Sequence, residues 1–454
     1  MSQKQSRFNK TTHLTSHKLH FILLQFTPLY LKIFKRQYLR IFHSIGFLLI
    51  SIFPAFGDSL SFNTAVEYFI EHNYDLQIAH QEADKSKADL TTAQRRPNPV
   101  LSGSYDYWDV KHHFHDVSDS ASALATVHID HPIELGGKRD RRIETANASI
   151  VYANNLFDET KREQLFTLID AYYQVQADEA DLRNAIANHR DFEDLLAIAQ
   201  AKYNHGFLSE IDLEKLQLQI IDYDKEVKSN NASLSADTEA LALLLSMKTD
   251  DVSMPSIVSP EPFLKSVNEL ISYAQQNRPD CLAAQQNIKV SNASVELEKA
   301  NAIPDITVGI ETENYAPTYG GPLVGISAAI PLPIYDRNEG AIQRSRITAL
   351  QASTQQSKIL QQAASEIRQS FIQYQSQQSI YTSMQHGFES AKKLKEKQEK
   401  IFSLKGISVL ELLDAQKSYR EYQKNMTHAI IDLHIATQYL KLYSGLSLIN
   451  TKAD

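Results

Sequence analysis

The sequence predicts a mainly α-helical chain with a small β part, built as two similar halves. Two stretches, from Gly137 to Gly206 and from Gly340 to Gly406, contain no proline, and Gly387 is the one glycine inside them. Such stretches are typical of very long helices. Segments that alternate apolar and polar residues precede each stretch, which indicates strands. The same elements occur twice in the same order, so the chain contains an internal repeat.

The composition excludes several classes of protein. With 22% charged and 43% hydrophobic residues over 454 positions, the chain is neither disordered nor a polytopic helical membrane protein. The single cysteine, Cys281, permits no intrachain disulfide and no thiolate zinc site. Residues 58–454 hold 38 basic and 54 acidic residues, a net charge of −16, which disfavours a nucleic-acid partner.

Residues 1–57 are predicted to be a basic leader and a signal peptide. They carry eight Lys or Arg residues and no acid. The short apolar run 41–53 precedes small residues at alternate positions, which favours secretory cleavage after about Gly57. The alternative, an anchoring helix, is disfavoured because the run is short for a membrane span. No run of 18 apolar residues follows Gly57, so the mature chain would cross a membrane only with strands.

The first half, residues 58–260, is expected to contain two short helices, two strands and a long helical hairpin. The expected ranges are 62–72 and 76–95 for the helices, about 100–110 and 123–133 for the strands, and 137–246 for the hairpin, with its tip near Gly206. Pro97 and Pro99 end the second helix because proline lacks the amide hydrogen that a helix needs. Alternation in the strands fits one face in lipid and one in water, and it fits a half-buried soluble sheet equally well.

The second half, residues 261–446, repeats this order and precedes a short tail, residues 447–454. The expected ranges are 267–276 and 282–302 for the helices, about 305–315 and 324–334 for the strands, and 340–444 for the hairpin, with its tip near Gly406. Each long helix would extend roughly 100 Å at about 1.5 Å per residue. Coiled-coil or barrel packing must support helices of that length. The outgoing helix is rich in glutamine, which indicates water on more than one side.

The strand number limits how such a sheet could sit in a membrane. Four strands cannot close a barrel, since the smallest membrane barrels have about eight. An open edge in lipid would leave backbone groups unpaired. If the strands lie in lipid, several chains must share one barrel, and three copies would supply about twelve strands.

Four sequence elements carry a resemblance to a known family. They are Asn98-Pro99, the junction from Pro132 to Arg139 (Pro-Ile-Glu-Leu-Gly-Gly-Lys-Arg), the segment from Pro331 to Gly340, and the segment from Gly406 to Gln416. Because these elements occur in this order over residues 60–445, the chain resembles the TolC family of bacterial outer-membrane efflux channels. The last two elements and the Gly-Gly-Lys-Arg form look most like its heavy-metal (cation) branch, which works with resistance-nodulation-division pumps. The lipid-anchor cysteine of many relatives is missing.

The resemblance implies a fold, a place and a set of partners. It implies a homotrimer with a twelve-stranded outer-membrane β-barrel in lipid and a periplasmic α-barrel, which joins a periplasmic adaptor and an inner-membrane pump. Such a protein passively conducts heavy-metal cations or drugs. The alternatives are a type I secretion conduit and a periplasmic coiled-coil structural protein. We expect no enzyme and no cofactor, because HExxH, GxSxG and dinucleotide motifs are absent from the sequence.

The hairpin tips are the expected adaptor contacts and the expected entrance. Helix-capping Gly and Ser residues mark both tips. The expected adaptor contacts are Gly206, Phe207, Ser209, Gly406, Ile407 and Ser408. Acids just past the tips, Asp212 and Asp414, could form rings that gate or select ions. Tyr203 and Tyr419 are either members of that gate or aromatics that pack the helices.

One histidine-rich segment is a candidate metal contact. His112, His113 and His115 are followed by His128, Asp130 and His131 on the next expected strand. Imidazole and carboxylate groups are suitable ligands for a divalent metal. The alternative is a solvated loop at the outer mouth, where such a composition has no special role.

Overall fold

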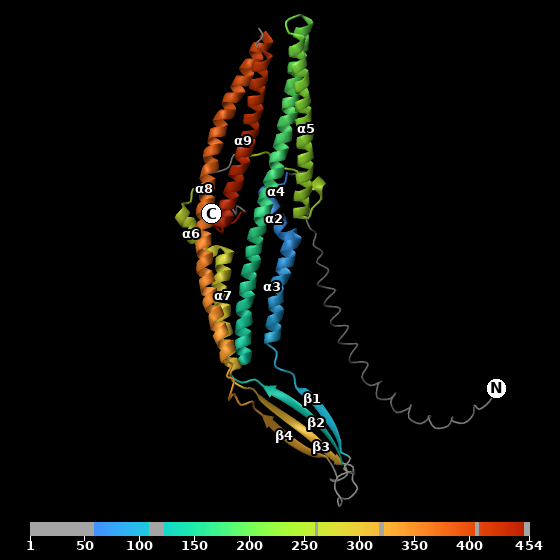
Figure 1. Ribbon diagram of the computed structural model, residues 1–454, viewed down its shortest axis with the longest axis vertical. Helices are drawn as coiled ribbons and strands as arrows, with labels where there is room; N and C mark the ends of the chain where they lie inside the picture. The colour runs from blue at the N-terminus through green and yellow to red at the C-terminus, as the bar shows by residue number, and fades with distance from the viewer. Residues whose placement is uncertain (1–58, 109–121, 259–261, 317–321, 405–407, 449–454) are drawn as a thin grey trace, which may run out of the picture. The chain divides into compact units, whose positions relative to one another are not determined.

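The computed structural model describes residues 59–108, 122–258, 262–316, 322–404 and 408–448 (Figure 1). Helices predominate, as predicted. They are α2 (Phe62–His72), α3 (Tyr74–Ala93), α4 (Lys138–Asn204), α5 (Glu210–Leu245), α6 (Val267–Asn277), α7 (Pro279–Asn301), α8 (Glu339–Leu404) and α9 (Val409–Tyr443), with a short 3₁₀ helix at Thr249–Asp251. The strands are β1 (Val100–Trp108), β2 (Ser122–Ile133), β3 (Ile306–Ala316) and β4 (Leu323–Ala329).

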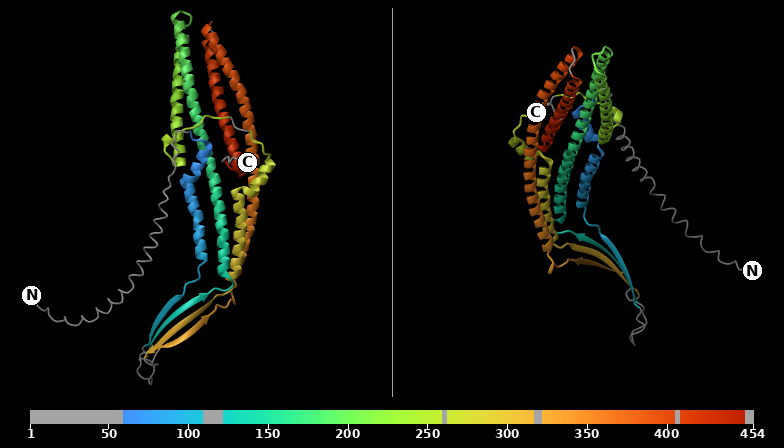
Figure 2. Two further views of the ribbon diagram at one scale, coloured as in Figure 1. Left: turned by 180° about the vertical axis from the view of Figure 1, so that it is seen from behind. Right: turned by 45° about the horizontal axis from the view of Figure 1, so that its top comes forward.

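The four strands form one antiparallel sheet in the order β1-β2-β3-β4 (Figure 2). The two halves meet inside this sheet, because β2 of the first half pairs with β3 of the second. In that register His128 lies opposite Glu311, and Ile129 lies opposite Ile310. The pairing places alternate residues of all four strands on a common face.

The fourth strand is shorter than predicted. It ends at Ala329, whereas the alternation in the sequence suggested an end near residue 334. Pro331 and Pro333 have no amide hydrogen to donate to a neighbouring strand, so they disfavour continuing the ladder. The prolines therefore separate the sheet from α8.

Both long hairpins are present, and the serine caps of their returning helices differ in detail. At the first tip Gly206 has φ +75°, the Gly206 amide donates to the Tyr203 carbonyl over 2.9 Å, and the Phe207 amide donates to the Lys202 carbonyl over 2.8 Å. This is a Schellman end, as the glycine predicted. Ser209 then accepts from the Asp212 amide over 3.1 Å. At the second tip Ser408 instead accepts from the Leu410 amide, two residues on.

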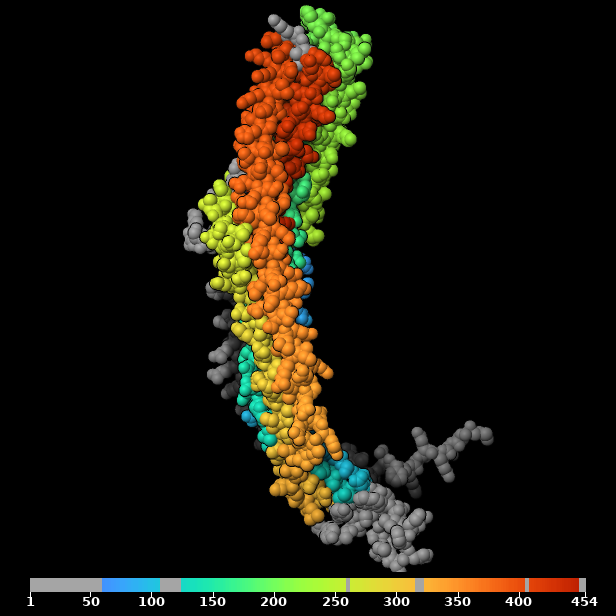
Figure 3. All heavy atoms as spheres, turned by 60° about the vertical axis from the view of Figure 1, so that its left-hand side comes forward, coloured from blue at the N-terminus to red at the C-terminus, as the bar shows by residue number. Residues whose placement is uncertain are grey.

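The helices are held by separate apolar clusters rather than by one core. One cluster joins α2, α4 and α5 through Phe69, Leu168, Tyr172 and Leu241, all buried. A second lies just below the tips and takes residues from α4, α5, α8 and α9. A third joins α6, α8 and α9. Figure 3 shows α8 on the surface, with α9 beside its upper part and α7 beside its lower part.

The junction between the sheet and α4 depends on two neighbouring glycines. Gly136 and Gly137 both have φ +69°, a left-handed conformation that L side chains rarely adopt. A Cβ on Gly136 would lie 2.7 Å from Ile303 Cδ1 and 3.2 Å from the Ala300 carbonyl oxygen of α7. A Cβ on Gly137 would meet nothing within 4 Å. Only the first glycine is therefore required by a close approach of another helix.

This pair offers a matched test of the junction. Gly137→Ala is expected to lower the free energy of unfolding by about 1–2 kcal/mol, which is the strain of the left-handed conformation. Gly136→Ala is expected to lose about 1–3 kcal/mol more, because it also overpacks the contact with α7. Denaturant unfolding of both variants measures the difference. Equal losses would contradict the close approach.

Candidate functional site: an inter-hairpin charged cluster and the acidic sheet face

The tips of both hairpins expose apolar side chains. Phe207 is 81% exposed at the first tip, and Ile211 follows it at 66%. Leu404 and Leu410 flank the second tip and are 71% and 70% exposed. The predicted contacts Gly206 and Ser209 lie at the first tip, and Ser408 caps the start of α9 at the second, whereas Gly406 and Ile407 lie outside the described residues.

The four predicted entrance residues have different surroundings. The Asp212 carboxylate accepts from Ser209 Oγ over 2.9 Å and lies 3.1 Å from Lys215 Nζ, and the Ser209 hydrogen bond lowers the pKa of Asp212. Asp414 is exposed on α9, and Tyr203 is exposed near the end of α4. Tyr419 is half-buried and lies farther along α9, where it stacks on Phe388. Asp212 thus has a local capping role, and Tyr419 packs between helices.

Tyr419 also contacts a buried cation. Lys395 of α8 is 8% exposed, and its Nζ lies 4.5 Å from the centre of the Tyr419 ring. The same Nζ lies 2.9 Å from Asp191 Oδ2 of α4 and 3.7 Å from Glu399 Oε1. Burial opposes the charge on Lys395, but the carboxylates prevail and raise its pKa. Burial raises the pKa of Glu399, although Lys395 opposes this effect.

A second cation completes the link between the hairpins. Arg420 of α9 places Nη1 3.0 Å from Glu226 Oε2 of α5, and its guanidinium lies 4.2 Å from the Tyr223 ring centre. Burial raises the pKa of Tyr223 to about 12. We call Asp191, Glu226, Lys395, Glu399 and Arg420 the inter-hairpin cluster. Its ion pairs connect α4 to α8 and α5 to α9.

The contacts along α4 and α9 below this cluster are also polar. Asn188 donates to Gln423 over 2.8 Å, and Asn184 donates to Thr427 over 3.3 Å. Each of these hydrogen bonds can be replaced by one to water, so separating the helices here loses little net free energy per bond, about 1 kcal/mol.

The sheet has one acidic, polar face. The carboxylates of the four strands, Asp106, Asp130, Glu311 and Glu313, all project from it. The strands carry no lysine or arginine within their described bounds. Glu311 lies 3.2 Å from His128 Nδ1 and covers Gly325, and Asp130 covers Gly309. Water beside this face would favour cations.

The opposite face of the sheet is apolar and exposed. Its prominent side chains are Leu101, Val127, Ile129, Ile310, Val324 and Ile326, each between 46% and 89% exposed. A soluble single chain rarely leaves so many adjacent apolar side chains uncovered. This face therefore needs an apolar environment outside the chain.

The described residues include only part of the predicted histidine-rich metal site. His112, His113 and His115 lie outside the described residues. His128 and Asp130 share the polar face, but His131 projects from the opposite face, where it lies opposite Val308. Within the described ranges, no three His, Cys, Asp or Glu side chains are grouped to hold a metal ion.

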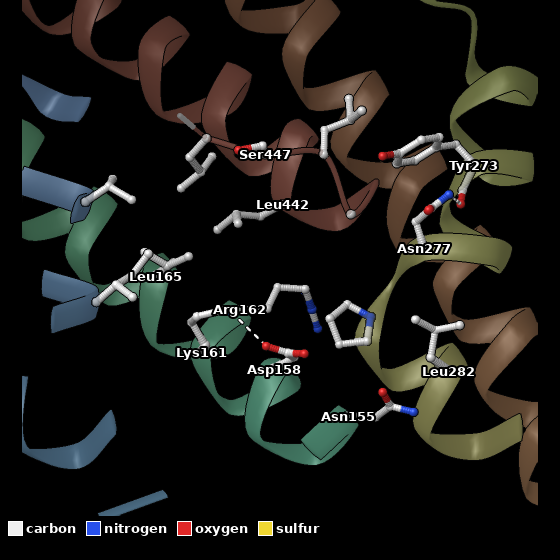
Figure 4. A pocket seen from close by; sticks show the side chains of 16 residues that line it. Asn155, Asp158, Lys161, Arg162, Leu165, Tyr273, Asn277, Leu282, Leu442 and Ser447 are labelled. Carbon is white, nitrogen blue, oxygen red and sulfur yellow. Dashed lines mark hydrogen bonds and ion pairs between the residues drawn. The ribbon is translucent and has the colours of Figure 1, made fainter. Parts of the chain in front are cut away.

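A cavity of about 450 Å³ lies between α4, α6, α7 and the end of α9 (Figure 4). Lys161 and Arg162 line it, and both are paired within α4: Lys161 Nζ lies 2.7 Å from Asp158 Oδ1, and Arg162 Nη2 lies 2.6 Å from Glu159 Oε1. No local sequence pattern predicts this cavity, because its walls come from both halves. Its cations are neutralised, so it offers an anion little attraction.

Helical hairpins that alternate with strand pairs, repeated twice around one shared sheet, define a class of channel-forming proteins. The chain belongs to the outer membrane efflux protein family, whose sequence profile matches residues 66–246 and 270–446. This confirms the predicted family. None of the described helices is both long enough and apolar enough to cross a membrane.

Named relatives and solved structures agree with this family. The cobalt-zinc-cadmium resistance protein CzcC of Cupriavidus metallidurans is 23% identical over 304 residues, which are 65% of this chain and 68% of CzcC. The cation efflux system protein CusC of Escherichia coli O157:H7 is 23% identical over 414 residues, 84% and 85% of the two chains. The solved structure of CusC matches with a TM-score of 0.68 at 16% identity, covering 85% of this chain and 92% of that one.

Proposed function

We propose that this chain is the outer-membrane channel-tunnel of a tripartite efflux system that passively conducts heavy-metal cations to the exterior. The acidic face of the sheet carries the proposal for a cationic substrate, since it presents four carboxylates and no lysine or arginine within the described strands. The names of CzcC and CusC, a metal-resistance and a cation-efflux protein, favour the same substrate class.

The proposed assembly is a homotrimer in the outer membrane, with the helices in the periplasm. β1 and β4 lie at the two ends of the sheet, and an edge strand in lipid must find a partner. Three copies would supply about twelve strands, enough for a closed barrel. Its apolar face would contact lipid, and its acidic face would line the water-filled lumen.

The proposed partners are a periplasmic adaptor and an inner-membrane resistance-nodulation-division pump. Phe207, Ile211, Leu404 and Leu410 would supply apolar contacts for the adaptor at the tips. The inter-hairpin cluster would hold the entrance closed, because it ties the hairpins of one chain together. Asp212, Asp414 and Tyr203 would line the entrance, and Tyr419 would act through its contact with Lys395.

Neighbouring residues on opposite faces of β4 provide the test. Ile326→Arg is expected to reduce the yield of membrane-inserted trimer strongly, since arginine on a lipid-facing strand costs about 2–4 kcal/mol at the bilayer midplane. Ser327→Arg should insert normally and lower the preference for cations, because it adds positive charge to the lumen face. Heat-modifiable trimers in outer-membrane fractions and the reversal potential in a salt gradient are the measurements.

The outcomes distinguish the parts of the proposal. Equal insertion of both variants would overturn the lipid-facing assignment. An unchanged reversal potential in Ser327→Arg would overturn the cation-selective lumen and leave the barrel intact. Metal sensitivity of a strain that lacks the chain, restored by the wild type, tests the substrate class.

A further inference from the structure

A buried carboxyl group in the middle of α4 lacks a donor. Asp178 is 8% exposed; its Oδ1 accepts from Gln174 Nε2 over 3.1 Å, whereas its Oδ2 is buried without a hydrogen-bond donor. The carboxyl group of Asp237, on α5, lies within hydrogen-bonding reach. Two carboxylates this close repel each other when both are ionised. A proton shared between them would satisfy Oδ2 and join α4 to α5.

A second protonatable contact lies about one turn farther along α4, toward α9. Asp181 Oδ2 lies 3.0 Å from His428 Nε2, and the Asp181 carbonyl accepts from Asn230 Nδ2 of α5 over 3.3 Å. With His428 protonated, the contact is an ion pair between α4 and α9. α4 packs against both α5 and α9, so the two contacts attach it to its two neighbours (Figure 1).

We propose that Asp178, Asp237, Asp181 and His428 form a proton-operated joint that attaches α4 to α5 and to α9 when protonated and loosens both attachments when deprotonated. The joint concerns contacts within one chain. It therefore goes beyond the proposed function and does not depend on it.

Both protons act in the same direction. Burial, and then the proximity of Asp237, raises the pKa of Asp178 to about 7. The hydrogen bond that the His428 ring donates to the Asp181 carboxylate raises the pKa of His428. A raised folded-state pKa means that the stabilising contribution is complete below the unfolded value and is lost as the pH rises through the folded value. The attachment of α4 to α5 is therefore strong in acid and weakens above about pH 7, and the attachment of α4 to α9 weakens as the pH rises through the raised pKa of His428.

The charged groups around the joint support this direction. Asp181 on α4 adds negative charge near Asp178 and so favours the shared proton. On α9, Asp432 favours the proton of His428, whereas Lys424 opposes it. Asp181 and Asp432 together outweigh Lys424 and the burial of the ring, so the pKa of His428 is raised.

Amide hydrogen exchange on the full-length protein tests the joint. In the wild type, protection factors around residues 174–182 and 424–432 should fall at least about tenfold between about pH 5 and pH 8. Asp237→Asn replaces the shared proton with a permanent amide donor, so it should abolish the part of this change on the α5 side. Adding His428→Gln should make the profile flat. Asp222→Asn, exposed on the same helix as Asp237, is the matched control and should keep the wild-type profile.

Infrared spectroscopy of the wild type provides a measurement that no folding defect can obscure. The carbonyl stretch of a protonated carboxyl group should disappear with a midpoint near pH 7, and Asp178→Asn should lack that transition. A flat exchange profile in the wild type, or a full pH dependence in the double variant, would overturn the joint. Neither result bears on conduction, so failure of the joint and failure of the conduit are distinguishable.

Discussion

Replacing Lys395 with methionine is expected to raise the conductance of the purified channel about tenfold in planar bilayers. The substitution keeps the buried apolar stem and removes the charge that lies 2.9 Å from Asp191. Asp191 and Glu399 are then left to repel each other between the hairpins. Breaking a buried pair costs about 3–5 kcal/mol. Because Asp191 is 57% exposed, water screens the charge and roughly 1–2 kcal/mol remains, which corresponds to about a tenfold change.

Two variants control this experiment. Lys392→Met alters an exposed lysine of the same helix and should leave the conductance at the wild-type value. The exchange Asp191→Lys with Lys395→Asp restores opposite charges across the same contact and should restore low conductance. If Lys395→Met conducts no better than Lys392→Met, the cluster does not hold the entrance closed.

Arg278→Leu is expected to be the most destabilising single substitution considered, at about 3–5 kcal/mol. Arg278 is 2% exposed and lies between α6 and α7. Its Nε lies 2.9 Å from Asp280 Oδ1, its Nη1 donates to the Tyr443 carbonyl over 3.2 Å, and its Nη2 pairs with Glu366 of α8. Leucine would leave two carboxylates and a carbonyl without their shared donor. The midpoint of guanidinium unfolding in detergent measures the loss.

An exposed arginine on α8 serves as the control for that measurement. Arg368→Leu should change the unfolding free energy by no more than about 0.5 kcal/mol, as is usual for surface substitutions. Arg278→Lys should fall between the two, since it keeps the charge and loses the planar fork that reaches several acceptors. A loss below about 1 kcal/mol in Arg278→Leu would contradict the anchoring role.

The fold was predictable because its main signals are local. Proline positions, helix-capping glycines and alternation of apolar residues act within a few residues along the chain. Alternation alone misplaced the end of β4, because Pro331 and Pro333 disfavour continuing the ladder beyond Ala329. Residue spacing alone did not predict the cap of α9, where the Ser408 side chain accepts from the Leu410 amide.

The candidate site was less predictable, because its contacts join residues far apart in the sequence. Lys395 and Asp191 are 204 positions apart, and Arg420 and Glu226 are 194 apart. None of these four residues belongs to a sequence motif. Tyr419 was identified as a gate or packing residue, but the lysine beside its ring had no signal in the sequence. The predicted metal contacts His112, His113 and His115 lie outside the described residues, so they stay a prediction.

The unpaired outer sides of β1 and β4 bear on how cells must produce this protein. A single chain would expose two unpaired strand edges, to which any extended peptide could bind as an additional strand. Newly made copies therefore need a chaperone or very rapid association with one another. Overproduction that exceeds the supply of chaperones should therefore yield insoluble aggregates. Cells should tolerate only a narrow range of expression levels of this protein.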